Sequence, residues 1–137
     1  MGPHEEADKM GIKNDSQAAA AYLPLTPAVF HVLLALAGGD KHGYAIMKDV
    51  AQRTEGNVRL SAGTLYGIIN RLLGDGMIVE TRDRPSPALD DQRRRYYRLT
   101  AFGREVAIAD ADRMEKVIAM ARSSRLLNRA KPEGQLP

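Results

Sequence analysis

The amino-acid sequence predicts a mainly α-helical domain of the α+β class. Three helical patterns follow one another between residues 27 and 74, two strand-like patterns lie between residues 77 and 100, and a long helical pattern starts at residue 101. A chain of 137 residues is the size of one domain and can bury a modest core without metal or disulfides. This order of elements predicts a winged helix-turn-helix followed by a C-terminal helix.

The chain divides into four predicted segments. Residues 1–22 are polar and then alanine-rich, without an apolar period, which predicts a flexible N-terminal arm. Residues 23–100 form the winged helix-turn-helix, and residues 101–127 form the C-terminal helix. Residues 128–137 lose the helical period and gain Pro and Gly, which predicts a flexible tail.

The first two helices have recognisable boundaries. Thr26 is a natural N-cap, and the apolar residues 27–37 predict a buried core helix. After a predicted turn at residues 40–43, residues 44–54 have the spacing of an amphipathic helix. We expect Tyr44 to lie on the core side of that helix and Gly43 to serve the turn.

The third helix separates an apolar side from an open side. Ser61 is its predicted N-cap, Leu and Ile residues between positions 65 and 73 form the apolar stripe, and Gly74 ends the helix. The opposite side carries small or hydrogen-bonding residues, namely Gly63, Gly67, Asn70 and Arg71. Since glycine lowers helix stability, its repeated use on this side indicates that another molecule must come close.

The wing and the last helix complete the predicted fold. Residues 77–82 and 94–100 are rich in β-branched and aromatic residues, which predicts two antiparallel strands joined by a loop with Pro85 and Pro87. The helix from residue 101 to about residue 124 has a broad apolar face. A face this wide on a terminal helix needs more than its own small domain to cover it.

Charge and composition narrow the function classes. Between Lys41 and Arg98, eleven basic residues outnumber seven acidic ones, which favours a polyanionic partner. The absence of cysteine excludes disulfides, thiolate zinc sites and cysteine nucleophiles. The chain lacks the Gly-rich phosphate loops and the serine-hydrolase motif, and its three histidines are scattered. We therefore predict no catalytic residue, no cofactor and no metal site.

Four motifs in succession resemble those of the PadR family of bacterial transcriptional regulators, over about residues 25–122. They are Leu25-Thr-Pro27, His42-Gly-Tyr44-x-Ile46, Ser61-x-Gly-Thr-Leu-Tyr66 and Tyr96-Tyr-Arg-Leu-Thr100-x-x-Gly103. Two features depart from the family pattern: Gly67 stands where the family usually has Pro, and Pro85-Ser-Pro-Ala-Leu89 lengthens the wing.

The resemblance implies a homodimeric, repressor-type regulator of the short-tailed subgroup, released in some members by a small-molecule inducer. The last helix then supplies the dimer interface, and the wide apolar face agrees with this independently. The interface residues are Phe102, Val106, Ala109, Met114, Val117, Ile118 and Ala121. A dimer is expected to bind an inverted repeat in double-stranded DNA.

The start of the third helix suits a phosphate group. Ser61 and the N–H groups of the first turn can hold a phosphate at the positive helix end. Gly63 and Gly67 let the backbone approach the DNA, and Thr64 adds a hydroxyl. Tyr66 lies beside the apolar stripe, where packing alone and contact with the DNA backbone are equally good interpretations.

Direct base readout is expected from Asn70 and Arg71, whose side chains suit adenine and guanine edges. Lys41 and His42 are expected to touch phosphate. At the base of the wing, the run of Arg93, Arg94 and Arg95 is expected to meet phosphates or a narrow minor groove.

One alternative is a winged helix used for protein–protein contact, in which the glycine side of the third helix meets a partner. Basic residues at both the helix and the wing favour DNA, and salt-dependent duplex binding separates the two functions. No apolar run approaches the roughly 20 residues of a membrane span, and no signal-peptide pattern opens the chain. We expect a soluble, cytoplasmic protein that joins the nucleoid when it binds DNA.

Overall fold

The computed structural model describes residues 17–82 and 95–127. A short helical segment at residues 17–20 is followed by α2 (Pro27–Ala37), β1 (Lys41–His42), α3 (Gly43–Arg53), α4 (Ala62–Gly74), β2 (Ile78–Thr81), β3 (Tyr96–Leu99) and α5 (Ala101–Ser123). The predicted fold class and order of elements are confirmed. The structure adds one element to the predicted order, the two-residue strand β1, where the sequence predicts only a turn.

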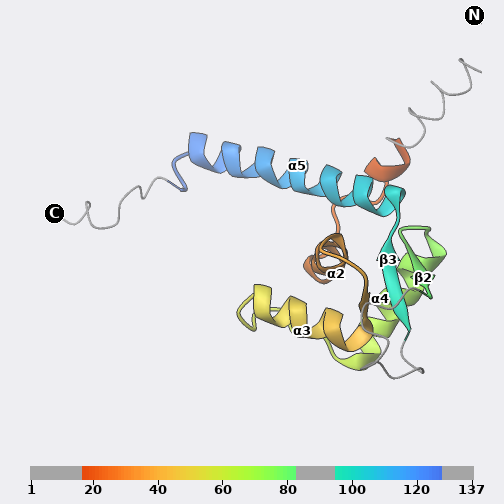
Figure 1. The fold of residues 1–137 in the computed structure, drawn as a ribbon. Coiled ribbons are helices and arrows are strands. Elements are labelled where there is room, and N and C mark those ends of the chain that lie inside the picture. Colours follow the sequence, from red (N-terminus) through yellow and green to blue (C-terminus); the bar gives the residue numbers. More distant parts are fainter. Residues whose placement is uncertain (1–16, 83–94, 128–137) are drawn as a thin grey trace, which may run out of the picture.

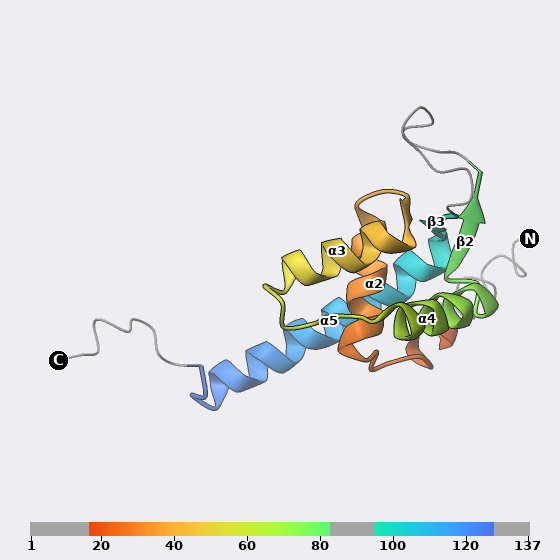
Figure 2. The same ribbon diagram turned by 90° about the horizontal axis from the view of Figure 1, so that it is seen from below.

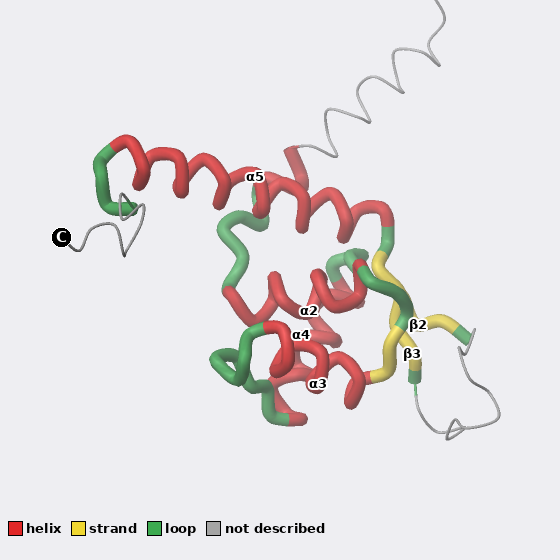
Figure 3. The backbone as a smooth tube through the Cα atoms, turned by 60° about the vertical axis from the view of Figure 1, so that its left-hand side comes forward, coloured by secondary structure: helices red, strands yellow, loops and turns green. Residues whose placement is uncertain are grey.

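Helix α2 lies at the centre of the domain. It is apolar on nearly every side, and other helices cover two opposite sides of it. Helix α5 crosses one side of α2, and α3 and α4 lie on the other side (Figures 1 and 3). Seen from below, α4 and α3 are in front and α5 runs behind them (Figure 2). The exposed surface of α4 and the length of α5 therefore belong to opposite sides of the domain.

The strands form one antiparallel sheet in the order β1-β3-β2. Lys41 pairs with Tyr97 across β1 and β3, and Ile78 pairs with Leu99 across β2 and β3. Strand β3 is thus central. Its residues Tyr97, which packs in the core cluster, and Tyr96, which meets the His42 ring on the other face, are both buried. The predicted loop between the two long strands falls at residues 83–94, outside the described residues.

The end of the predicted N-terminal arm belongs to the core, so this part of the prediction is wrong. Ala19 is only 3% exposed and packs in the core cluster. The ring of Tyr22 meets that of Phe102 edge-on, with the ring centroids 6.0 Å apart. A single short turn of alanines shows no apolar period, and for that reason its burial is invisible in the sequence.

Helix α3 is rotated relative to the sequence prediction. Gly43, Ile46 and Val50 face the core, whereas Tyr44 is 60% exposed and the expectation that it is buried is wrong. The apolar residues of this segment cover more than one side of the helix, so their spacing does not fix its orientation. Aliphatic side chains fill the core at no polar cost, while Tyr44 keeps its hydroxyl in water.

Helix α5 begins on the turn before β2. Thr100 is its N-cap: Oγ1 accepts a hydrogen bond from the Gly103 N–H at 2.9 Å and donates one to the Gly76 carbonyl at 2.7 Å. A Cβ at Gly103 would overlap the Met77 carbonyl oxygen. The first turn of α5 therefore packs directly on the backbone that connects α4 to β2.

The stripe of α5 that packs on the domain continues beyond it. Gly103, Val106 and Asp110 are buried within the chain, so the prediction of Val106 as a dimer-interface residue is wrong. Further along the same stripe, Val117 is 47% exposed. The second half of α5 extends past α2 (Figures 1 and 2), so the domain no longer covers it.

Candidate nucleic-acid interface

The N-terminus of α4 has the predicted cap and an exposed first turn. Ser61 Oγ accepts a hydrogen bond from the Thr64 N–H at 3.1 Å and lies 3.0 Å from Thr64 Oγ1. Among the described residues, the N–H groups of Ala62 and Gly63 have no acceptor. An exposed helix N-terminus with free N–H groups attracts anions, so the geometry for a phosphate contact is present.

The outer side of α4 is bare. A Cβ built at Gly63, Gly67 or Gly74 would have no atom of the described residues within 4 Å, and Asn70 on the same side is exposed. The apolar side of the helix faces the core, where Leu65, Ile69 and Leu72 are buried. Another molecule can therefore approach the helix backbone at Gly63 and Gly67, as the glycine pattern predicts, while Gly74 lies at the C-terminal end of the helix.

Tyr66 lies at one edge of this bare side and contacts the start of α3. A Cβ at Gly43 would overlap its hydroxyl, so glycine at the start of α3 leaves room for the tyrosine, a more specific role than the predicted turn. The ring stays 45% exposed. Burial raises the pKa of Tyr97, and the neighbouring Tyr66 and Glu80 act in the same direction. Tyr66 thus both packs against the start of α3 and presents surface to solvent.

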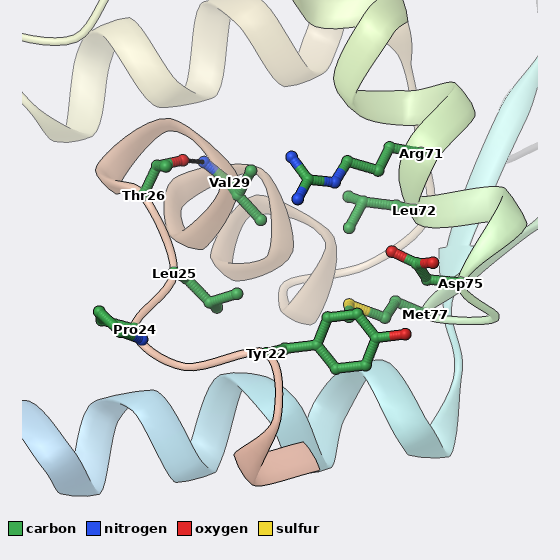
Figure 4. A pocket seen from close by; sticks show the side chains of 9 residues that line it. All are labelled: Tyr22, Pro24, Leu25, Thr26, Val29, Arg71, Leu72, Asp75 and Met77. Carbon is green, nitrogen blue, oxygen red and sulfur yellow. Dashed lines mark hydrogen bonds between the residues drawn. The ribbon is translucent and has the colours of Figure 1, made fainter. Parts of the chain in front are cut away.

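Arg71 occupies the other flank of α4. Its side chain is directed toward the N-terminus of α2, where it lines a pocket with Thr26 and Val29 (Figure 4). Within residues 17–82 and 95–127, its guanidinium makes no hydrogen bond or ion pair. The residue is exposed and unpaired, but it lies at the edge of the bare side of α4 rather than at its centre.

Lys41 and His42 have roles inside the domain. Lys41 Nζ donates a hydrogen bond to the Ala35 carbonyl at 2.7 Å and so stabilises the C-terminus of α2. His42 is the N-cap of α3, because its Nδ1 accepts a hydrogen bond from the Ala45 N–H at 3.1 Å. Its ring also meets Tyr96 edge-on. The phosphate contacts predicted for these two residues stay a prediction.

The described part of the wing carries one of the three predicted arginines. Arg95, the residue before β3, has its Nη1 3.7 Å from Oε1 of Glu80 in β2, in an exposed ion pair. Such a pair contributes little stability, so Arg95 can exchange it for a phosphate at small cost. Arg93 and Arg94 lie outside the described residues.

Two cations that the sequence pattern does not single out, Lys48 and Arg59, lie together before the start of α4. The chain from α3 to α4 runs back alongside α3 (Figure 2), and a groove of about 310 Å³ lies between them. It is lined by Tyr44, Met47, Lys48, Ala51, Arg59 and Leu60. Lys48 and Arg59 look like ordinary surface charges in the sequence, and only the return of the chain brings them together.

Residues 17–82 and 95–127 also lack two other kinds of feature. None of the helices in those ranges combines the length and hydropathy of a bilayer-spanning helix. The same ranges contain no group of three His, Cys, Asp or Glu side chains that could hold a metal ion.

Comparisons with known proteins connect this geometry to a family. A model of the transcriptional regulator PadR-like family matches residues 32–108. The transcriptional regulator Rv3488 of Mycobacterium tuberculosis is 30% identical over 87 residues, which cover 64% of this chain and 75% of the relative. A solved transcriptional regulator from Clostridium thermocellum matches with a TM-score of 0.58 at 25% identity, over 70% of this chain and 87% of that one.

The same fold occurs in a PadR family transcription regulator from hypervirulent Clostridium difficile, with a TM-score of 0.58 and 21% identity over 70% of this chain and 95% of that one. The family match extends from α2 into α5 and so includes α4 and the sheet. It confirms the resemblance carried by the four sequence motifs. The chain therefore belongs to the PadR-like family of transcriptional regulators, which are DNA-binding proteins rather than enzymes.

Proposed function

We propose that this protein is a homodimeric repressor that binds an inverted repeat in double-stranded DNA, with α4 in the major groove. The observation that carries the proposal is the bare side of α4. A helix that has two glycines, Gly63 and Gly67, on its exposed surface loses stability, which is explained if a partner approaches its backbone there. The exposed, unpaired N–H groups of its first turn suit a phosphate.

Base readout falls to Asn70 on the bare side and Arg71 on its flank. Phosphate contacts fall to Ser61 and Thr64 at the helix start and to the cations around it. On the α3 side these cations are Lys48 and Arg59, and on the wing they are Arg93, Arg94 and Arg95. Lys41 and His42, at the start of α3, are kept as further phosphate contacts in this proposal. Contacts to phosphate set the register of the protein on the duplex, and contacts to base edges give specificity.

The dimer forms through the second half of α5, in this proposal. Val117, Ile118 and Met120 are 47%, 43% and 65% exposed on a helix that extends beyond its own domain. Met114, Ala121 and the partly covered Phe102 and Ala109 extend the apolar surface. A two-fold dimer presents two α4 helices to two half-sites of opposite orientation.

Footprinting on genomic fragments selected by the purified protein tests this function. We expect protection of an inverted repeat whose half-site centres lie about one helical turn, roughly 10 bp, apart. Affinity should fall steeply with salt concentration because several phosphates are neutralised. Protection of a single asymmetric site by one protomer, or salt-insensitive binding, would contradict the proposal.

Replacing Gly67 with alanine should separate stability from DNA binding. The added methyl group meets open space, so the free energy of unfolding should rise by about 0.5–1 kcal/mol. The same methyl group stands between α4 and the duplex, so affinity for the selected operator should fall. Denaturation and duplex titration measure the two effects. Gly74→Ala, at the C-terminal end of the helix, is the matched control and should stabilise α4 while leaving affinity near that of the parent protein.

Replacing Arg95 with alanine should weaken binding to all sequences alike. The slope of log affinity against log salt concentration should become shallower by about one phosphate contact. The variant Glu80→Gln removes the same ion pair but keeps the arginine, so it should leave the slope intact. An equal loss of slope in both variants would show that the pair acts only by shaping the wing.

A further inference from the structure

A small pocket connects the flank of α4 with the N-terminus of α2. It has a cavity volume of about 70 Å³ and draws its walls from three parts of the chain (Figure 4). The lining residues on which the inference depends are Leu25, Val29, Arg71, Leu72, Asp75 and Met77. Three of these residues belong to α4 or its C-cap, so an occupant would touch the helix that the proposed function places in DNA.

Two opposite charges face this pocket without meeting each other. Arg71 and Asp75 are one turn apart on α4, a spacing at which such side chains commonly pair. Among the described residues, neither the guanidinium nor the carboxylate makes a hydrogen bond or an ion pair. Figure 4 shows the guanidinium reaching over the cavity and the carboxylate directed into it from the side. The pocket therefore offers a donor fork and a carboxylate acceptor at once.

The rest of the lining is apolar and small. Leu25, Val29 and Met77 surround the space opposite the charges (Figure 4). A cavity of roughly 150 Å³ holds benzene, so a cavity half that size holds an aliphatic group of about three carbons and excludes an aromatic ring. The charged rim and the small apolar interior together define the shape of a ligand.

We propose that this pocket binds a small aliphatic α-amino acid in its zwitterionic form. The carboxylate of the ligand pairs with the Arg71 guanidinium, which suits planar carboxylates, and its ammonium group donates to the Asp75 carboxylate. The aliphatic side chain of the amino acid, of about three carbons, fills the space beside Leu25, Val29 and Met77. A carboxylic acid without an amine would leave Asp75 unpaired, and an amine without a carboxylate would leave Arg71 unpaired.

The regulatory consequence rests on the proposed function. Arg71 is the proposed reader of a guanine edge, and it cannot hold a ligand carboxylate and a base at the same time. The amino acid therefore weakens operator binding. Because coupling between two ligands is reciprocal, bound operator weakens the amino acid by the same factor.

Calorimetric titration of the protein without DNA tests the pocket, with L-valine as the probe. We expect a dissociation constant between about 0.01 and 1 mM. Isovalerate lacks the amine, isobutylamine lacks the carboxylate, and L-phenylalanine carries a ring too large for the cavity, so each should bind at least about tenfold more weakly. Absence of valine binding up to about 10 mM, or equal binding of isovalerate, would overturn the proposal.

Two substitutions locate the binding site. Arg71→Gln and Asp75→Asn should each weaken valine binding by about tenfold or more, with unfolding curves confirming that both variants fold. Asn70→Ala is the matched control, because Asn70 is adjacent in the helix but does not line the pocket. It should keep valine binding. An equal loss in all three variants would place the amino acid elsewhere.

Titration of the selected operator in the presence of valine tests the coupling. A rise in the operator dissociation constant with valine, abolished in Asp75→Asn, supports the competition. Valine binding with unchanged operator affinity overturns the competition. Valine binding to a protein that binds no duplex under any condition leaves the pocket supported and shows instead that the proposed function has failed.

Discussion

Replacing Val117 with aspartate is expected to convert the proposed dimer into monomers. Val117 continues the stripe of α5 that is buried in the domain, and it is 47% exposed in the single chain. In a two-fold interface the substitution occurs twice, so two unpaired carboxylates would be buried. We expect the dimer dissociation constant to rise by at least about 100-fold, with a parallel loss of operator affinity. Analytical ultracentrifugation measures the first effect and duplex titration the second.

The matched control for this experiment is Ala119→Asp. Ala119 is exposed on the opposite side of α5, so the same charge on the same helix should leave the dimer intact. A Val117→Asp protein that still sediments as a dimer would place the interface elsewhere. Dissociation by both variants would show that added charge, rather than the position of the interface, is responsible.

Replacing Gly103 with alanine should have the largest effect on stability. The new methyl group would overlap the Met77 carbonyl oxygen and lie 2.9 Å from Leu99 Cδ1. Backbone cannot yield as a flexible side chain does, so we expect a loss of about 3 kcal/mol or more in the free energy of unfolding. Chemical denaturation measures it. Gly67→Ala makes the same change where space is open, and an equal loss in both variants would show that the contact at Gly103 is not responsible.

Local signals in the sequence predicted the elements well. Thr26, Ser61 and Thr100 each cap a helix with a side-chain oxygen that accepts an N–H three residues later. The expected boundaries of α4 and α5 agree with the structure within about a residue, because caps and apolar periods act within one turn. Strand β1 was missed since two residues cannot show a period, and only the pairing with β3 creates it.

Long-range packing explains the errors. Val106 and Tyr44 are both apolar and periodic in sequence, but Val106 is covered by its own domain and Tyr44 is left in solvent. The spacing of residues on a helix defines a face without specifying what covers it. The candidate site shows the same limit, because the chemistry of Arg71 could be predicted while its direction toward Thr26 and Tyr22 depends on the fold.

The contact between Gly103 and Met77 has a consequence for the geometry of the whole assembly. Thr100 hydrogen-bonds the Gly76 carbonyl, and the first turn of α5 rests on Met77, immediately after α4 ends. Helix α5, which the proposal places in the dimer interface, and helix α4, which it places in DNA, are thereby held at a set angle without a flexible linker between them. In the proposed dimer, the contact of α5 with residues 76–77 determines how far each α4 helix lies from the two-fold axis. Small shifts at residues 76–77 would then change the operator spacing that the protein accepts, even though these residues touch no base.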